Sequence, residues 1–161
     1  MIIRGYRTSD IPEMLSVWNE IVSEGNAFPQ DDLLLLGEAE SFFASQTYCA
    51  VAYDEIKNKI CGLYILHPNN VGRCSHIANA SFAVSGNCRG MGIGRRLVTD
   101  CIENAGKFGF EILQFNAVVA SNAPAIRLYE DLGFVRLGTV PRGFRKPDGS
   151  FSDIVLFYRE L

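Results

Sequence analysis

The spacing of apolar residues along the chain predicts a mixture of helices and strands. Apolar positions recur every three or four residues over 11–22 and 97–105, so each of these segments should form a helix with one buried face. Shorter apolar runs bounded by turn residues predict strands. In chain order we predict a strand at 2–6, helices at 11–24 and 38–44, strands at 48–53, 60–67 and 77–84, a helix that follows the glycines of 90–94, a strand at 112–119, a helix at 123–132, and strands at 134–140 and 154–158.

This order of elements predicts one α/β domain, residues 1–161, built on a mixed sheet. The composition, 48% hydrophobic and 20% charged, is typical of a globular protein, and the chain has no internal repeat or linker. No apolar run approaches the ~18 residues that a membrane span needs, and no long apolar run follows the first basic residues. We therefore expect a cytoplasmic protein without a membrane segment.

Charge and cysteine content disfavour several classes of protein. A formal net charge of −3 is unlike that of a domain that binds nucleic acid by bulk charge, so any phosphate should be held locally. The five cysteines form no C-x-x-C pair and have no histidine cluster nearby. We therefore expect neither a disulfide framework nor a metal site.

A glycine-rich turn joins a predicted strand directly to a helix. It reads Arg89-Gly-Met-Gly-Ile-Gly-Arg95. Glycine permits positive φ and a close approach to the backbone, and a helix N-terminus supplies unpaired N–H groups, so the turn predicts a phosphate-bearing ligand. The segment lacks the lysine and hydroxyl of a Walker A loop. Its glycine rhythm also differs from the dinucleotide pattern G-x-G-x-x-G, although Glu111 lies near the distance at which that pattern has an acid.

Two segments resemble motifs of one family. Arg89-x-x-Gly92-x-Gly94 resembles the (Q/R)-x-x-G-x-(G/A) acyl-CoA signature of the GCN5-related N-acetyltransferases, the GNAT superfamily. Residues 122–134 resemble its second motif, N-x-x-A-x-x-[LF]-Y-x-x-x-G-F, and the order of the elements matches from end to end. The resemblance implies the GNAT acyl-CoA N-acyltransferase fold, a twisted mixed sheet flanked by helices, with acetyl-CoA as co-substrate and no metal.

The resemblance also assigns roles in binding acetyl-CoA. Backbone amides of the turn would hold the pyrophosphate, with Arg89 or Arg95 adding charge at the rim. The end of the preceding strand would separate from its neighbour and bond the pantetheine arm, as would Asn122, while Tyr129 would protonate the departing thiolate. The implied cofactor-binding residues are Phe82, Ala83, Val84, Arg89, Gly90, Met91, Gly92, Ile93, Gly94, Arg95, Asn122 and Tyr129.

The implied acceptor side has amides where related enzymes have a carboxylate. Asn79 occupies the position of a glutamate in enzymes that resemble phosphinothricin acetyltransferases, and an amide cannot act as a base at neutral pH. A water, His76 or an acceptor of low pKa could meet that need. Segments 76–80 and 115–122 also resemble N-acetyltransferases of proline analogues such as azetidine-2-carboxylate. That likeness implies that Asn79 and Asn116 orient the acceptor and that water is the base. Asn116 lies in an apolar strand, so we expect it to need a hydrogen-bonding partner.

The resulting hypothesis is direct acetyl transfer from acetyl-CoA to a small amine, an amino acid or an analogue. The basic segment 142–146 fits an acceptor that carries a carboxylate. A peptide or protein N-acetyltransferase, a non-catalytic acyl-CoA sensor and a nucleotide-binding protein stay open as alternatives. Exposed strands near the C-terminus predict a homodimer, and we expect no nucleic-acid or membrane partner.

Overall fold

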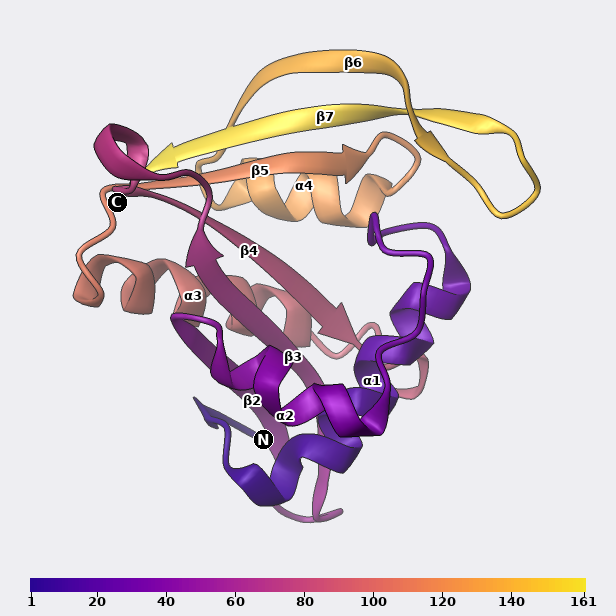
Figure 1. Ribbon diagram of the computed structural model, residues 1–161, viewed down its shortest axis with the longest axis vertical. Coiled ribbons are helices and arrows are strands. Elements are labelled where there is room, and N and C mark those ends of the chain that lie inside the picture. The colour runs from indigo at the N-terminus through magenta and orange to yellow at the C-terminus, as the bar shows by residue number, and fades with distance from the viewer.

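A computed structural model describes all 161 residues and contains one seven-stranded sheet of order β1-β2-β3-β4-β5-β7-β6 (Figure 1). The strands are β1 (Ile2–Gly5), β2 (Tyr48–Asp54), β3 (Lys59–Pro68), β4 (Ile77–Val84), β5 (Ile112–Val119), β6 (Val135–Arg145) and β7 (Phe151–Glu160). The main helices are α1 (Ile11–Glu24), α2 (Leu36–Ala44), α3 (Ile93–Lys107) and α4 (Ala123–Asp131). The predicted order of elements and the mixed α/β sheet are confirmed.

The largest difference from the predicted boundaries is in the C-terminal hairpin. β6 and β7 extend well beyond the predicted 134–140 and 154–158. Their pairing shifts register between Arg136 and Gly138 and again between Val140 and Phe144, and Arg142 has a positive φ of 56°. Such irregularities break the two-residue alternation by which a strand is recognised, so the pattern predicted strands that were too short.

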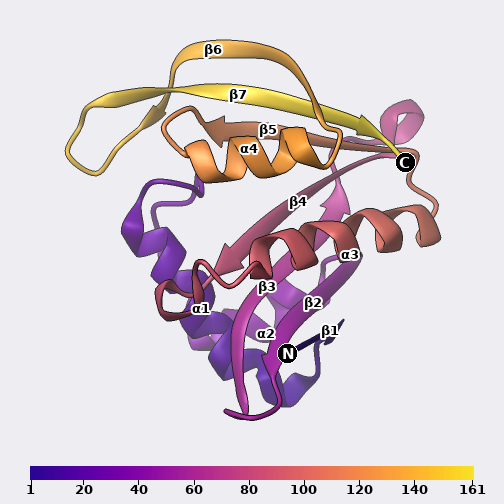
Figure 2. The same ribbon diagram turned by 180° about the vertical axis from the view of Figure 1, so that it is seen from behind.

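Helices cover both faces of the sheet. α1 and α2 lie on the face turned to the viewer in Figure 1, here called the front face, and α3 and α4 lie on the opposite, back face (Figure 2). Each side has its own buried cluster, one around Trp18 and Phe43 and the other around Leu97 and Phe157. None of the helices has the length and apolar character that crossing a membrane requires.

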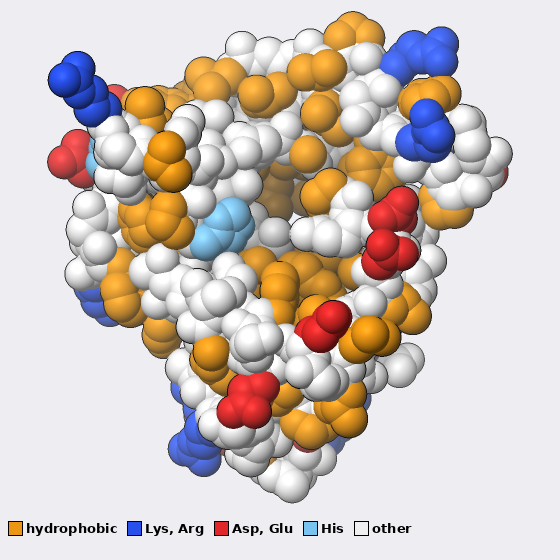
Figure 3. All heavy atoms as spheres, viewed as in Figure 1, with side chains coloured by type: hydrophobic (Ala, Val, Ile, Leu, Met, Phe, Trp, Pro, Cys, Tyr) orange, Lys and Arg blue, Asp and Glu red, His pale blue; other side chains and the backbone are white.

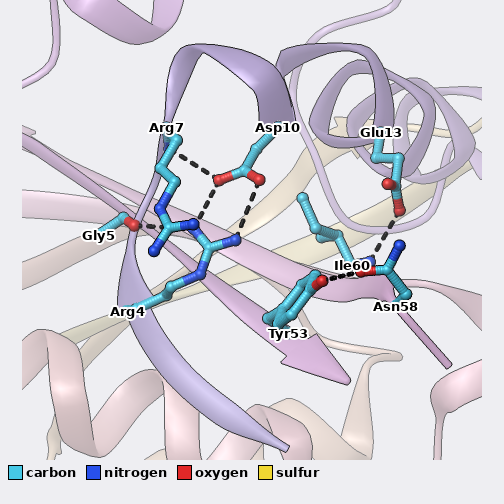
Figure 4. A network of polar contacts seen from close by, with 8 residues as sticks. All are labelled: Arg4, Gly5, Arg7, Asp10, Glu13, Tyr53, Asn58 and Ile60. Carbon is cyan, nitrogen blue, oxygen red and sulfur yellow. Dashed lines mark hydrogen bonds and ion pairs between the residues drawn. The ribbon is translucent and has the colours of Figure 1, made fainter. Parts of the chain in front are cut away.

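Polar contacts fix the start of α1 against the sheet (Figure 4). The guanidinium of Arg4 in β1 donates to both carboxylate oxygens of Asp10, at 2.6 and 3.0 Å, and lowers the pKa of that carboxyl. The Arg7 N–H also donates to Asp10, and Glu13 accepts from the Ile60 N–H at 2.8 Å. With its first turn anchored in this way, α1 directs its C-terminal end toward the turn between β4 and α3.

Candidate functional site

The parallel strands β4 and β5 separate soon after they begin. Each has eight residues, but they pair only at Ile77 with Ile112 and at Ala78 with Leu113. In Figure 1 the two strands diverge from a common end. The predicted separation is therefore present, and it leaves one edge of β4 without a strand partner. We call this opening the β4–β5 split.

Backbone groups of alternate β4 residues face the split. The Ala80 N–H bonds the side chain of Asn79 at 2.8 Å, and the Val84 carbonyl accepts from Arg89 Nε at 3.3 Å. Because direction alternates along a strand, the backbone of Phe82 faces the same way. Ala83 is different, since a Cβ on Gly62 of β3 would come within 2.7 Å of its carbonyl oxygen. Its carbonyl thus points to β3, away from the split.

The glycine turn presents a row of free backbone donors. Gly90 and Gly92 have φ of 76° and 72°, a conformation that favours glycine, and Ile93 begins α3. Following the chain from Gly90, the first backbone N–H that bonds a protein atom belongs to Arg96, which donates to the Gly92 carbonyl at 3.3 Å. The N–H groups of residues 90–95 bond no protein atom. Consecutive free N–H groups at a helix N-terminus form a site for an anion such as a pyrophosphate.

Both arginines assigned to the rim of this turn are engaged with carboxylates. Arg89 donates to both oxygens of Glu24 at 2.7 Å, and Arg95 donates to Asp131 at 2.6 Å. Glu20, one turn before Glu24 in α1, accepts from the Gly86 N–H at 2.7 Å. Two carboxylates of α1 therefore hold the turn in place. Sequence reasoning missed them, because no local pattern links α1 to a turn 65 residues further on.

Tyr129 of α4 lies among aromatic rings behind the split. Its ring centroid is 6.4 Å from that of Phe82 in β4 and 4.7 Å from that of Phe115 in β5, so its neighbours come from both sides of the split. Phe134 and Phe157 complete the surroundings. Burial raises the pKa of the phenol, which therefore stays protonated well above neutral pH. Its hydroxyl has no bond to another protein group and is free to donate a proton.

Asn122 caps the same helix. Its side-chain oxygen accepts from the Ala125 N–H at 3.3 Å, which satisfies one of the unpaired donors of the first turn. Its amide N–H groups bond no other protein atom and can donate to a ligand, as the resemblance implies. Asn122 and Tyr129 thus stand near opposite ends of α4, beside the split.

Neutral polar side chains gather on the front face of the split. Asn79 is half-buried, and its oxygen is occupied by the Ala80 N–H. Asn116 lies where the pairing of β5 shifts register, and it donates to Asn69 at 2.5 Å and accepts from Gln114 at 3.1 Å. Asn116 therefore has the partner we expected. It is nevertheless exposed, because the irregularity turns it out of the regular strand.

The two histidines both lie near the start of β4, on different elements. His76 is at the closed end, where its carbonyl accepts the N–H groups of Glu111 and Ile112. His67, which the sequence analysis passed over, is the cross-strand partner of Asn79. Figure 3 shows a hollow with an apolar floor near the middle of the front face and a histidine side chain on its rim.

These parts together suit one kind of chemistry. The turn can hold a pyrophosphate, the free edge of β4 can bond an extended amide-containing chain, and a protonated phenol lies where such a chain would end. A second molecule can enter from the front face. The arrangement fits transfer of an acyl group from a long phosphate-bearing thioester to a small nucleophile.

Comparisons with known proteins lead to the same family. The model of the Acetyltransferase (GNAT) family matches residues 12–134. N-acetyltransferase aca1 of Schizosaccharomyces pombe is 36% identical over 137 residues, which cover 76% of this chain and 66%, just under two thirds, of that protein. A GCN5-related N-acetyltransferase from Kribbella flavida has a TM-score of 0.91 and 35% identity, with 99% of this chain and 97% of that one covered.

A third relative has a more specific name. The ribosomal-protein-alanine N-acetyltransferase of Brucella melitensis has a TM-score of 0.92 and 26% identity, with both chains covered completely, 100% of each. The residues that the family model matches include the turn, both strands of the split and Tyr129. The chain belongs to the acetyltransferase (GNAT) family and is, by that membership, an acetyl-CoA-dependent N-acetyltransferase.

Proposed function

We propose that the acceptor is a small amine, an amino acid or an amino-acid analogue, which attacks acetyl-CoA directly in a ternary complex. The observation that carries this proposal is the neutral lining of the front-face opening, where Asn69, Asn79, Gln114 and Asn116 supply amides and no carboxylate. Amides can both donate and accept, so they suit the mixed groups of an amino acid better than a polycation.

The charges around the hollow support an acceptor with two opposite charges. Lys and Arg side chains lie at the upper right of the front face, and Asp and Glu side chains follow its right-hand side (Figure 3). The hairpin turn that follows the basic residues 142–146 packs on the end of α1, since a Cβ at Gly25 would come within 2.2 Å of Pro147. The exposed Asp31 and Asp32 lie in the loop after α1. Cationic and anionic groups on this face complement the carboxylate and ammonium of an amino acid.

The roles of the predicted site residues are part of the proposal. Free N–H groups of 90–95 hold the pyrophosphate, and the backbone of Phe82 and Val84 bonds the pantetheine arm together with Asn122. Asn79 and Asn116 orient the acceptor amine. Tyr129 gives its proton to the CoA sulfur as the carbon–sulfur bond breaks.

Release of the CoA thiol reports directly on this activity. The protein is incubated with acetyl-CoA and a panel of proteinogenic amino acids, azetidine-2-carboxylate, phosphinothricin, aminoglycosides and short peptides. We expect release with one or more amino acids or analogues and none with aminoglycosides. Activity restricted to peptide N-termini would overturn the small-acceptor proposal and favour the second candidate, a peptide acceptor, which the name of the Brucella relative supports.

We also propose that the chain forms a homodimer through the C-terminal hairpin. β6 is the edge strand of the sheet, and Val135, Leu137 and Val140 expose 59%, 55% and 44% of their area. A long apolar edge strand is a template for pairing with a second copy. Light scattering should give twice the mass of the chain, and Leu137→Lys should reduce it to that of a monomer. A wild-type protein that is monomeric at micromolar concentration would exclude this assembly.

A further inference from the structure

Acetyl transfer to an amine requires a group that accepts the proton the nitrogen loses. The amide of Asn79 cannot do so, and the three carboxylates at the cofactor turn, Glu20, Glu24 and Asp131, are held by the Gly86 N–H, Arg89 and Arg95. The amides on the front face of the split cannot accept a proton. The imidazole of His67, on the same face, has a ring nitrogen that can.

The register of the sheet places His67 beside Asn79, which the proposed function assigns to the acceptor. His67 in β3 pairs with Asn79 in β4, the first residue beyond the last paired position of β4 and β5. Paired residues in antiparallel strands project to the same face. Ile65, two residues earlier, belongs to the buried cluster under α1 and α2, so His67 projects to the front face as well. Asn69, two residues later, bonds Asn116 of β5.

One ring nitrogen of His67 is fixed by the backbone. Nδ1 lies 3.0 Å from the carbonyl oxygen of Pro68. A carbonyl oxygen only accepts, so in the neutral ring the hydrogen is on Nδ1. The lone pair is then on Nε2, which bonds no protein atom. A histidine oriented through Nδ1–H in this way presents Nε2 as a proton acceptor.

His67 has no ion-pair partner. No carboxylate lies within ion-pair distance of either histidine. Across β4 the facing residue is Asn79, and the nearby titratable side chain of β2, Tyr48, contacts the rings of Tyr64 and Phe108 on the back face at tilted angles. Asp31 and Asp32, in the loop after α1, are solvent-exposed. Nothing else on these elements competes with the acceptor nitrogen for Nε2.

We propose that His67 is the proton acceptor of the transfer reaction. The amine nitrogen attacks the thioester carbonyl carbon and forms the C–N bond, and its proton passes to His67 Nε2. The C–S bond then breaks, and the departing sulfur takes the proton of Tyr129. Solvent removes the proton from the imidazolium and returns one to the phenolate. The inference rests on the amine transfer proposed above. His76 does not serve, because it stands at the closed end of the split.

The test compares His67→Gln with His76→Gln as a matched control. With an acceptor from the panel, we expect His67→Gln to lower kcat about 100-fold while KM for acetyl-CoA stays within twofold, as removal of a general base does. His76→Gln should retain kcat within twofold. Thermal melting and calorimetric binding of CoA show that each variant is folded and binds the cofactor. Added imidazole should restore part of the activity of His67→Gly.

A second measurement needs no acceptor. Acetyl-CoA hydrolysis by the enzyme uses water in place of the amine, so its rate tests the proton acceptor without any acceptor amine. We expect His67→Gln to hydrolyse acetyl-CoA at least tenfold more slowly than the wild type and His76→Gln to match the wild type. If no amine of the panel is acetylated, the acceptor proposal fails, while hydrolysis still tests His67. Hydrolysis by His67→Gln within threefold of the wild-type rate would overturn the role of His67.

Discussion

The site has a donor side, for acetyl-CoA, and an acceptor side, for the amine, and different kinds of chemical group form them. The proposed donor side consists of backbone groups from one continuous stretch, the end of β4, the glycine turn and the first turn of α3. The proposed acceptor side consists of side chains from the end of β3, the following loop, β4 and the irregular part of β5. Recognition of a ligand by backbone groups requires that one stretch of chain adopts a particular conformation. Recognition by side chains requires that residues from separate segments come together.

This difference explains why the ligand of the donor side is easier to identify than the ligand of the acceptor side. The turn identifies its ligand class by the glycines with positive φ and the free N–H groups. The acceptor side depends on His67 lying opposite Asn79 and on Asn69 reaching Asn116, two contacts set by strand register and by a bulge-like shift. The following variants separate the two sides, beginning with the largest effect.

Tyr129→Phe removes the proposed acid, which serves both sides. We expect kcat to fall about 100-fold while CoA affinity stays within twofold, because the hydroxyl bonds no protein group and the ring is retained. Tyr53→Phe, in β2 and remote from the split, is the matched control and should leave kcat unchanged. Steady-state kinetics and calorimetry measure the two quantities. Loss of CoA binding in Tyr129→Phe would show that the hydroxyl acts in binding.

Gly92→Ala disturbs the donor side alone. A non-glycine residue at φ of 72° costs about 1–2 kcal/mol, so the turn should shift and KM for acetyl-CoA should rise about tenfold. With saturating acetyl-CoA, KM for the acceptor should stay within twofold. Gly106→Ala is the control, because a Cβ there meets nothing within 4 Å inside α3 and should raise the melting temperature. Equal effects on both KM values would refute the separation of the two sides.

Glu24→Gln should have a smaller effect on the same side. The ion pair with Arg89 has side chains 28% and 48% exposed, so its loss should raise KM for acetyl-CoA about two- to fivefold. The double variant Glu24→Arg, Arg89→Glu exchanges the two charges. It should recover the affinity for acetyl-CoA if the ion pair only positions the turn. Failure of that exchange would mean that Arg89 itself contacts the cofactor. Glu130→Gln, which breaks the exposed pair with Arg136, is the control.

The smallest expected effect is that of alkaline pH on kcat. Burial raises the pKa of Tyr129, so its phenol keeps its proton where an exposed tyrosine begins to lose it. We therefore expect kcat at saturating substrates to show no decrease between pH 8 and 10. Rate measurements over that range, with melting temperatures recorded at each pH, check this. A decrease near pH 9 in the folded protein would show that the acid is a different group or that Tyr129 is well solvated.

Sequence patterns predicted most of the fold, with two informative exceptions. Helical periodicity and cap residues gave α1 and α4 to within a residue or two, and Gly25 ends α1 at a φ of 62° as its position indicated. The hairpin of β6 and β7 was predicted too short, because register shifts interrupt its alternation. In the site, the sequence did not indicate that Glu24 binds the guanidinium of Arg89, whose role at the cofactor stays a prediction. A partner 65 residues away leaves no local signal.

The sequence by itself determined the cofactor turn of the proposed donor side. The glycines of the turn, the helix that follows and the motif of 122–134 are local features, and local features fix backbone conformation and so the free N–H groups. Tertiary structure decided the free edge of β4, the brace of the turn and the whole of the proposed acceptor side. The separation of β4 from β5, the contacts of Glu20 and Glu24 with the turn and the pairing of His67 with Asn79 depend on contacts between distant segments. Such contacts follow from packing of the whole sheet, which no single stretch of residues encodes.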